Sequence, residues 1–296
     1  MSVPFLEIKE NETLEIVSLL DKLKQNTINF KSCYIHNELF SILHDTISKT
    51  TIYSKLLHQA QDSLYSNKDG FLLIDFGNNF MFNEKTRKVL TIFLSGVLYP
   101  FGIFDKYGLW KEIGVDLTKE TNRSSGVGYN PFHIDFVNTA TPPPYSILFC
   151  MREDPNGGGE TIISNFLNVL KLFPPKELKY LSEDVFEEGM FFGLNNVGKE
   201  RNPFPVIETN LQREVIIRFT AKMKSKTKYF YLIKKIEEEL IKNQKTFLLK
   251  KNQLLIMNQR VVCHGRLSLK GKQEELNPNN RRLLIQTFGK NYEPII

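Results

Sequence analysis

A histidine and an aspartate stand one residue apart in the segment YNPFHIDFVN, which spans residues 129–138 and follows a stretch with the composition of a loop. If this segment is extended, side chains two positions apart point to the same face, so His133 and Asp135 converge. An imidazole nitrogen and a carboxylate oxygen form a mixed donor set that suits first-row divalent metals such as iron. The pair alone also fits a surface pair or a hydrogen-bonded core histidine, because so short a motif arises by chance.

A third metal ligand is expected on a later strand. The chain has five histidines, and three of them lie in a region of helical pattern, where a solvated or hydrogen-bonded role is expected: His36, His44 and His58. The remaining candidate is His264, which follows the apolar run of RVVCHGR. Two histidines and one carboxylate make the facial triad of non-haem Fe(II) oxygenases, which leaves three coordination positions open.

Two further residue types could hold an anion near such a metal. Arg282 lies in NNRRLLIQTF, and a guanidinium inside a pocket needs an anion, for which its planar fork suits a carboxylate. The hydroxyl of Thr161, in GGGET, can donate to the same anion. Arg281 and Arg282 point opposite ways on an extended segment, so at most one faces inward easily, and a solvent-facing pair is the alternative.

The elements that must position these residues are mostly strands. Runs of β-branched or aromatic residues between turn residues predict strands at 70–76, 146–151, 161–164, 205–208, 214–219, 253–258, 260–265 and 282–288. Apolar residues at helical spacing predict helices over 13–25, parts of 37–65, 83–98 with Asn83 as N-cap, 174–182 and 229–243. Residues 100–131 are rich in glycine and proline, which predicts long loops.

The order of these elements favours a mainly β protein with outer helices. Many strands with few alternations of strand and helix predict antiparallel sheets. No segment between strands has the composition of a linker, so we expect one domain over 1–296, with a mostly helical region at 1–65 packed on the β core.

Composition is ordinary for a soluble globular protein, at 41% hydrophobic and 24% charged residues. No apolar run is long enough for a membrane helix and the start lacks the features of a signal peptide, so a cytoplasmic location is expected. Three widely spaced cysteines, Cys33, Cys150 and Cys263, form no disulfide framework, which fits a reducing compartment.

The formal charge of +6 is concentrated partly in two short basic runs, 222–228 and 250–251. A nucleic-acid interface needs basic residues interleaved with stacking aromatics on one face. We therefore expect both runs to be solvated surface and expect no nucleic-acid partner. The excess positive charge favours anionic substrates.

The order of the motifs resembles that of the Fe(II)/2-oxoglutarate-dependent oxygenases, and within them the taurine dioxygenase and clavaminate synthase group. The resemblance runs from GFLLIDFG (70–77) through HID, GGGET and CHGR to RRLLIQTF, which ends at Phe288. Residues 1–65 match no motif of the group. The resemblance implies a double-stranded β-helix, or jelly roll, with outer helices.

It also implies the metal and cosubstrates Fe(II), 2-oxoglutarate and O2. His133, Asp135 and His264 match the iron ligands of the group. Arg282 matches the arginine that pairs with the far carboxylate of 2-oxoglutarate, and Thr161 matches the threonine that helps to hold this cosubstrate.

The sequence departs from the group at Gln286, where many members carry a second arginine. Gln286 can form hydrogen bonds but brings no charge, so the contact made to the near carboxylate of the cosubstrate is left open. Arg281 can substitute for Arg282 in binding the far carboxylate, and the sequence does not exclude this.

The implied reaction converts 2-oxoglutarate to succinate and CO2 and hydroxylates an unactivated C–H bond. Asp135 is present, whereas related halogenases lack this carboxylate, so hydroxylation is the first expectation and desaturation or cyclisation the alternative. Clavaminate synthase relatives often act on amino acids or natural products derived from them, so we expect a small polar substrate with a carboxylate. A peptide or a substrate bound to a carrier protein is the alternative, and an acidic carrier would suit the basic surface.

Candidates for substrate contact lie in loops expected around the mouth of the barrel, at 108–131, at 191–204 and after His264. The first loop could act as a lid. Five residues are the candidates: Trp110, Arg123, Asn130, Phe132 and Asn138. Two functions of other classes stay open, namely a non-catalytic jelly-roll binding protein and a basic nucleic-acid-binding protein.

Overall fold

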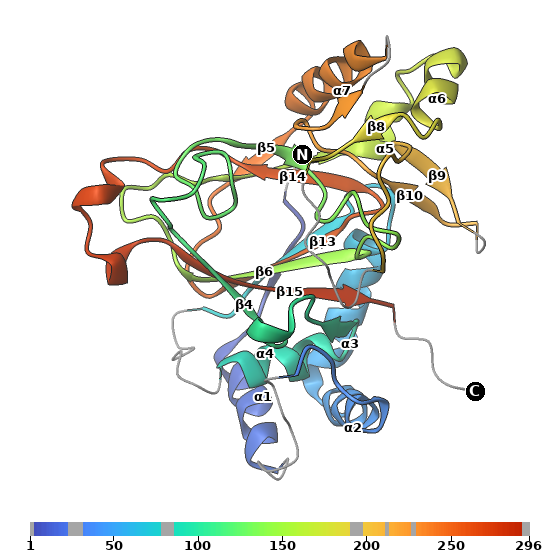
Figure 1. Cartoon of the computed structure of the whole chain (residues 1–296). Coiled ribbons are helices and arrows are strands. Elements are labelled where there is room, and N and C mark those ends of the chain that lie inside the picture. Colours follow the sequence, from blue (N-terminus) through green and yellow to red (C-terminus); the bar gives the residue numbers. More distant parts are fainter. Residues whose placement is uncertain are drawn as a thin grey trace.

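The computed structural model describes residues 3–22, 32–77, 86–189, 198–210, 213–225 and 229–291. Two layers of strands face each other in Figure 1, with α1 to α4 beyond one layer and α5 to α7 beyond the other. This arrangement confirms the prediction of a mainly β protein with outer helices. None of the helices in these ranges has the length and apolar character needed to cross a membrane.

The larger sheet has seven strands in the order β1-β2-β13-β6-β15-β3, with β4 also paired to β15. Its members are β1 (Phe5–Glu7), β2 (Phe71–Asp75), β3 (Tyr99–Phe101), β4 (Lys111–Gly114), β6 (Tyr145–Arg152), β13 (Gln253–Asn258) and β15 (Leu283–Lys290). All pairs are antiparallel except β1 with β2, as expected for a chain with few strand–helix alternations.

The smaller sheet has four antiparallel strands in the order β12-β7-β14-β5. They are β5 (Asn130–His133), β7 (Thr161–Asn165), β12 (Lys245–Phe247) and β14 (Val262–Arg266). Two short antiparallel ribbons lie beside this sheet: β8 (Phe186–Glu187) with β11 (Lys224–Ser225), and β9 (Ile207–Thr209) with β10 (Val215–Ile217).

Side chains alternate between the two faces of each strand, so one face packs between the sheets and the other packs against the helices. Leu73 and Leu255 of the larger sheet pack with Ile163 and Val262 of the smaller sheet in one buried cluster between the sheets. Their sequence neighbours Leu72, Leu254, Ile162 and Cys263 belong to the two other clusters, which contain the helices. Side chains two residues from Val262 therefore also face the space between the sheets, which is where His264 lies.

The helices cover the outer faces of both sheets. They are α1 (Glu10–Lys22), α2 (Asn37–Ser48), α3 (Thr51–Gln59), α4 (Thr86–Leu94), α5 (Phe166–Leu170), α6 (Pro175–Leu181) and α7 (Phe230–Lys242). Buried residues of α2, α3 and α4, such as Phe40, Ile52 and Phe93, share a cluster with the outer face of the larger sheet. On α7, Leu232, Ile236 and Leu240 recur at helical spacing and pack beyond the smaller sheet.

The long apolar strands were predicted to within about two residues, and the strands predicted at 205–208 and 214–219 overlap the three-residue β9 and β10. Other short strands were missed: residues 100–131 were expected to be loop but contain β4, and β3 ends at Phe101. Such short segments carry little pattern of their own, because their pairing partners define them. Of the predicted helix over 83–98, α4 spans Thr86–Leu94, and the proposed cap Asn83 lies outside the described residues.

A buried arginine joins the β9–β10 ribbon to the chain that follows the metal motif. The side chain of Arg218 is fully buried, and its guanidinium donates to Glu208 Oε1 at 2.8 and 2.9 Å. It also donates to the carbonyl oxygens of Val137 at 2.7 Å, Ala140 at 3.0 Å and Thr139. A buried charge is stable only when it is paired and hydrogen-bonded, so these contacts fix residues 137–140 in place.

Replacing this arginine is therefore expected to be costly. Arg218→Met leaves three backbone carbonyls without their donor and Glu208 paired only with the partly exposed Arg201, and should lower the free energy of unfolding by about 3–5 kcal/mol. Urea denaturation followed by circular dichroism measures this loss. The exposed Lys251→Met is the control and should change stability by less than about 0.5 kcal/mol. Equal stability of the two variants would contradict the buried network.

Candidate active site

The three predicted metal ligands meet on the inner face of the smaller sheet. His264 of β14 pairs directly with His133 of β5, and their ring centroids are 4.5 Å apart. Asp135 follows β5 in a turn, with Oδ1 3.9 Å from His133 Nε2 and Oδ2 3.7 Å from His264 Nε2. One donor atom from each residue lies within 4.8 Å of the other two. These separations place two imidazole nitrogens and a carboxylate oxygen around one point.

Both imidazoles present a ring nitrogen to the point where the three residues meet. His133 Nδ1 donates to the carbonyl oxygen of Pro131 at 2.8 Å, which orients the ring with Nε2 facing Asp135. Burial and the neighbouring His133 lower the pKa of His264, against the opposing charge of Asp135, to about 4. His264 is therefore neutral at neutral pH, the form in which histidine binds metals.

The carboxylate of Asp135 is held by side chains of the larger sheet. Its Oδ2 accepts hydrogen bonds from Ser146 Oγ at 2.7 Å and Gln286 Nε2 at 3.3 Å. The backbone N–H of Asp135 donates to Gln259 Oε1 at 2.6 Å, and Gln259 is itself fully buried. Partners of this kind orient metal ligands in proteins. Ser146 and Gln259 were not recognised from sequence, although Ser146 stands out as a hydroxyl residue in an apolar strand.

Gln286 thus contacts a candidate metal ligand. It was expected to contact the cosubstrate, and that role stays a prediction. Lys111 lies opposite Gln286 in the β4–β15 pairing, so both side chains share the inner face of the sheet. The Lys111 ammonium sits 5.1 Å from the ring centroid of Phe104. Burial lowers the Lys111 pKa, and the charges of Tyr107 and Asp135 oppose this shift.

An irregularity in β5 brings Asn130 onto the inner face. His264 pairs with His133 whereas Arg266 pairs with Asn130, so two steps along β14 match three along β5. An extra residue in one strand is a β-bulge. Pro131 lies in this stretch, where its missing N–H does not interrupt a regular ladder. Asn130 therefore shares a face with Arg266, and through it with His264.

A buried and unpaired guanidinium lies near the same face. Arg282, just before β15, is 8% exposed, and within the described ranges its side chain has neither an ion pair nor a hydrogen bond. Its Cδ and Nε would lie 3.5 Å from a Cβ at Gly159, two residues before Thr161. Burial lowers the pKa of Arg282, and Cys150 and Asp154 oppose this shift. A buried guanidinium of this kind requires an anion.

A second arginine, which the sequence analysis did not single out, strengthens the positive charge. Arg266 lies opposite Thr161 in the β7–β14 pairing. Its Nη2 donates to the carbonyl oxygens of Gly126 at 2.7 Å and Gly128 at 2.8 Å, which fastens the predicted lid loop to β14. Burial and the charge of Arg282 lower the pKa of Arg266 to about 10, and Asp154 opposes this shift. Two such cations favour an anionic ligand.

Arg281 occupies a different position from Arg282. It is half-buried, and its carbonyl oxygen accepts a hydrogen bond from Arg152 Nε at 3.0 Å. Adjacent residues of an extended segment face opposite ways, and Arg282 is the more deeply buried of the two.

Two of the predicted substrate contacts, Phe132 and Trp110, are buried in clusters that contain helices. Phe132 is fully buried in the cluster beyond the smaller sheet, together with Phe166, because it alternates with His133 and faces outward. Trp110 is buried in the cluster under the larger sheet, and its Nε1 donates to Thr91 Oγ1 at 3.0 Å. Aromatic residues near a motif are common in cores, and their orientation was not visible in the sequence.

Three candidates remain: Asn130, which lies on the inner face at the bulge of β5, Arg123 and Asn138. Arg123 is partly exposed, and its Nε donates to Glu120 at 2.9 Å within a turn. Asn138 is buried, and its carbonyl oxygen accepts from the backbone N–H of Arg201 at 2.9 Å. Their roles toward substrate stay predictions.

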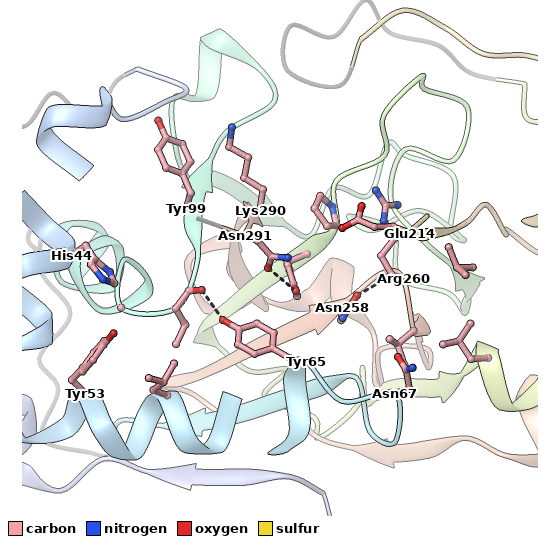
Figure 2. A pocket seen from close by; sticks show the side chains of 18 of the residues that line it. His44, Tyr53, Tyr65, Asn67, Tyr99, Glu214, Asn258, Arg260, Lys290 and Asn291 are labelled. Carbon is pink, nitrogen blue, oxygen red and sulfur yellow. Dashed lines mark hydrogen bonds between the residues drawn. The ribbon is translucent and has the colours of Figure 1, made fainter. Parts of the chain in front are cut away.

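A cavity of about 1090 Å³ lies elsewhere, at the ends of β6, β13 and β15 beside the helical region (Figure 2). Tyr65 donates there to the carbonyl oxygen of Val97 at 2.7 Å, and Tyr145 donates to Asn291 Oδ1 at 2.9 Å. None of the three candidate metal ligands lines this cavity, so it is separate from the candidate active site.

Comparison with known proteins agrees with this geometry. The sequence pattern of the family described as taurine catabolism dioxygenase TauD, TfdA family matches residues 67–285. The chain belongs to the TauD/TfdA family. It is accordingly an Fe(II)/2-oxoglutarate-dependent dioxygenase, as the order of its motifs predicted. No curated protein sequence gives a significant match.

Solved structures of similar fold include two amino-acid oxygenases. Asparagine oxygenase, in complex with Fe(II), 2S,3S-3-hydroxyasparagine and succinate, is 18% identical, with a TM-score of 0.74 over 96% of this TauD/TfdA chain and 92% of that chain. The non-haem iron oxygenase OrfP, with Fe, succinate and (3R,4R)-dihydroxy-L-Arg, is 12% identical, with a TM-score of 0.72 over 97% and 94%. These likenesses confirm the predicted jelly-roll fold.

The hydrogen bond from Ser146 to Asp135 yields a prediction about metal affinity. Ser146→Ala should weaken Fe(II) binding by about 10–100-fold, because the carboxylate loses a donor that orients it. Anaerobic isothermal titration calorimetry with Fe(II) measures this change. Ser164→Ala is the matched control, because Ser164 is also buried in a strand but its hydroxyl has no partner within the described ranges. Equal affinity of the Ser146 variant and the wild type would refute the assignment.

Proposed function

We propose that this TauD/TfdA oxygenase hydroxylates an unactivated C–H bond of a small amino acid or an amino-acid-derived natural-product intermediate. The observation that carries the proposal is the meeting of His133, Asp135 and His264 on one face beside the buried, unpaired Arg282. The donor set of two imidazoles and one carboxylate fits Fe(II) and leaves positions for cosubstrates. We infer that the whole chain acts as one oxygenase domain located in the cytoplasm.

The three candidate ligands and their hydrogen-bond partners have separate roles in this proposal. His133 and His264 bind the metal through imidazole nitrogens, and Asp135 binds it through a carboxylate oxygen that Ser146 and Gln286 keep in place. When bound, Fe(II) together with 2-oxoglutarate and O2 supplies the oxidising power for C–H hydroxylation, with succinate and CO2 as products. The surrounding residues aim one substrate C–H bond at the metal.

In this proposal, positively charged side chains bind the carboxylates of 2-oxoglutarate. Arg282 takes the far carboxylate of 2-oxoglutarate, and the hydroxyl of Thr161 donates to it, since neither group has a hydrogen bond within the described ranges. Arg266 adds positive charge next to Thr161. We favour Arg282 over Arg281 because Arg282 is the more deeply buried of the two and has no other partner to satisfy its charge.

The substrate class is suggested by the neighbouring folds. Asparagine oxygenase was solved with a hydroxylated asparagine and OrfP with hydroxylated arginine, each together with succinate. We therefore favour a free amino acid as the substrate, over a peptide or a substrate bound to a carrier protein.

Anaerobic addition of Fe(II) and 2-oxoglutarate to the protein should produce the visible charge-transfer band of a chelated Fe(II)–2-oxoglutarate complex. His264→Ala and Asp135→Ala should abolish this band, whereas His58→Ala, which alters an exposed histidine of α3, should retain it. A folded wild-type protein without the band would refute the proposed metal and cosubstrate site.

Arg282→Met should raise the Michaelis constant for 2-oxoglutarate by roughly 30-fold or more, because one partner of a buried charge pair is lost. Arg281→Met is the matched control and should change it by less than about threefold, since Arg281 is half-buried and lies outside the proposed contact. Succinate formation at varied 2-oxoglutarate measures both values. A larger effect at Arg281 would transfer the role to that residue.

A further inference from the structure

A pair of opposite charges lies beside His133 and takes no part in the sites described above. Segment 219–221 runs along β5: Thr220 is bridged to His133, and the N–H of Ala221 donates to the carbonyl oxygen of Phe132 at 2.9 Å. Lys222 follows this segment. β11 comes next and pairs with β8, which ends just before Glu188. The chain therefore leads from His133 to Lys222 and on to Glu188.

Lys222 carries a positive charge that no described carboxylate pairs with. Its Nζ donates to the carbonyl oxygen of Asn122 and lies 3.5 Å from Oδ1 of Asn130, on the inner face of β5. Burial lowers its pKa. The expectation that the basic run 222–228 is solvated surface was therefore wrong for Lys222, whereas Lys224 is exposed and residues 226–228 lie outside the described residues.

Glu188 carries the matching negative charge. Its Oε2 is buried and has no hydrogen-bond donor within the described ranges. Its backbone is fixed by Asn202, whose side chain accepts from the Glu188 N–H at 3.3 Å and donates to the Glu188 carbonyl oxygen at 3.1 Å. Burial raises the pKa of Glu188, and the charges of Arg123, Lys222 and His133 oppose this shift. The pairing of β8 with β11, and the bridge from Thr220 to His133, place Glu188 on the same side of β5 as Lys222.

No described ion pair joins Glu188 to Lys222, so neither charge satisfies the other directly. A buried carboxylate oxygen without a donor, and a partly buried ammonium without an anion, are both costly. A bound molecule with one positive and one negative group would remove both costs at once.

We propose that Glu188 and Lys222 bind the two charged groups of a free amino acid next to the metal. Lys222 and the amide of Asn130 receive the substrate carboxylate, and Glu188 receives the ammonium group. This rests on the proposed function and narrows it. A substrate attached to a carrier protein has a thioester in place of the carboxylate, and a peptide-linked residue lacks one or both charges, so neither satisfies this pair.

The experiment uses the full chain loaded with Fe(II) and 2-oxoglutarate. Succinate release is measured with each proteinogenic L-amino acid in turn. For the most active amino acid, two analogues are then compared: the desamino acid, which lacks the ammonium group, and the primary amide, which lacks the carboxylate charge. Binding of each compound is also followed by its perturbation of the anaerobic charge-transfer band.

Glu188→Gln should raise the Michaelis constant for the amino acid by at least about 10-fold, with kcat changed less than about threefold, and should have little effect on the desamino acid. Lys222→Met should weaken binding of the amino acid similarly but not binding of the amide. Glu187→Gln, a neighbouring carboxylate on β8, and the exposed Lys251→Met are the controls and should match the wild type. This pairing of variant with analogue separates direct recognition from a loss of folding.

The outcomes separate this inference from the proposed function. A charge-transfer band with succinate release only on peptide, N-acylated or carrier-bound compounds would keep the oxygenase and overturn the role of Glu188 and Lys222. Equal losses on the amino acid and both analogues would also overturn it, because they indicate a structural role. Absence of the charge-transfer band in the wild type would instead refute the oxygenase site itself.

Discussion

The pairing of His133 with His264 across β5 and β14 is the contact on which the rest of the site depends. The two strands are far apart in the sequence, and their antiparallel register sets the two rings 4.5 Å apart on the inner face. Asp135 reaches the same point from the turn after β5, and β6 and β15 of the opposite sheet supply the hydrogen bonds to its carboxylate. The site is therefore shared by both sheets and needs their packing to be complete.

Within the part of the chain that the structure describes, buried charged side chains without an ion-pair partner surround the three candidate metal ligands. Arg282 and Arg266 are cations on one side of the inner face, whereas Lys222 and Glu188 form a pair of opposite charges beside His133. Burial makes each of these groups costly in the absence of a ligand, which is the condition under which binding energy becomes large and specific. A dicarboxylate suits the first region and a zwitterion the second. On the roles proposed above, charge would distinguish the cosubstrate from the substrate.

Particular residues show where reasoning from sequence succeeded. His133, Asp135 and His264 were singled out because metal-binding residue types at a two-residue spacing and at the end of an apolar strand are visible without coordinates. Orientation was not visible in the same way. Phe132 faces outward into the core and Trp110 packs under the larger sheet, whereas Gln286 contacts Asp135. Lys222 belongs to a basic run but turns toward Asn130. Each of these depends on packing between distant segments.

The sequence by itself determined the fold class, the long strands and the residues able to bind iron, because these follow from local pattern and side-chain chemistry. Only the tertiary structure decided which side chains share the inner face. A bulge at Pro131 brings Asn130 next to Arg266, and strand pairing places Ser146 and Gln286 on Asp135. It also decided which charges lack partners, because the burial and pairing of Arg282, Lys222 and Glu188 result from contacts between segments that no local pattern encodes.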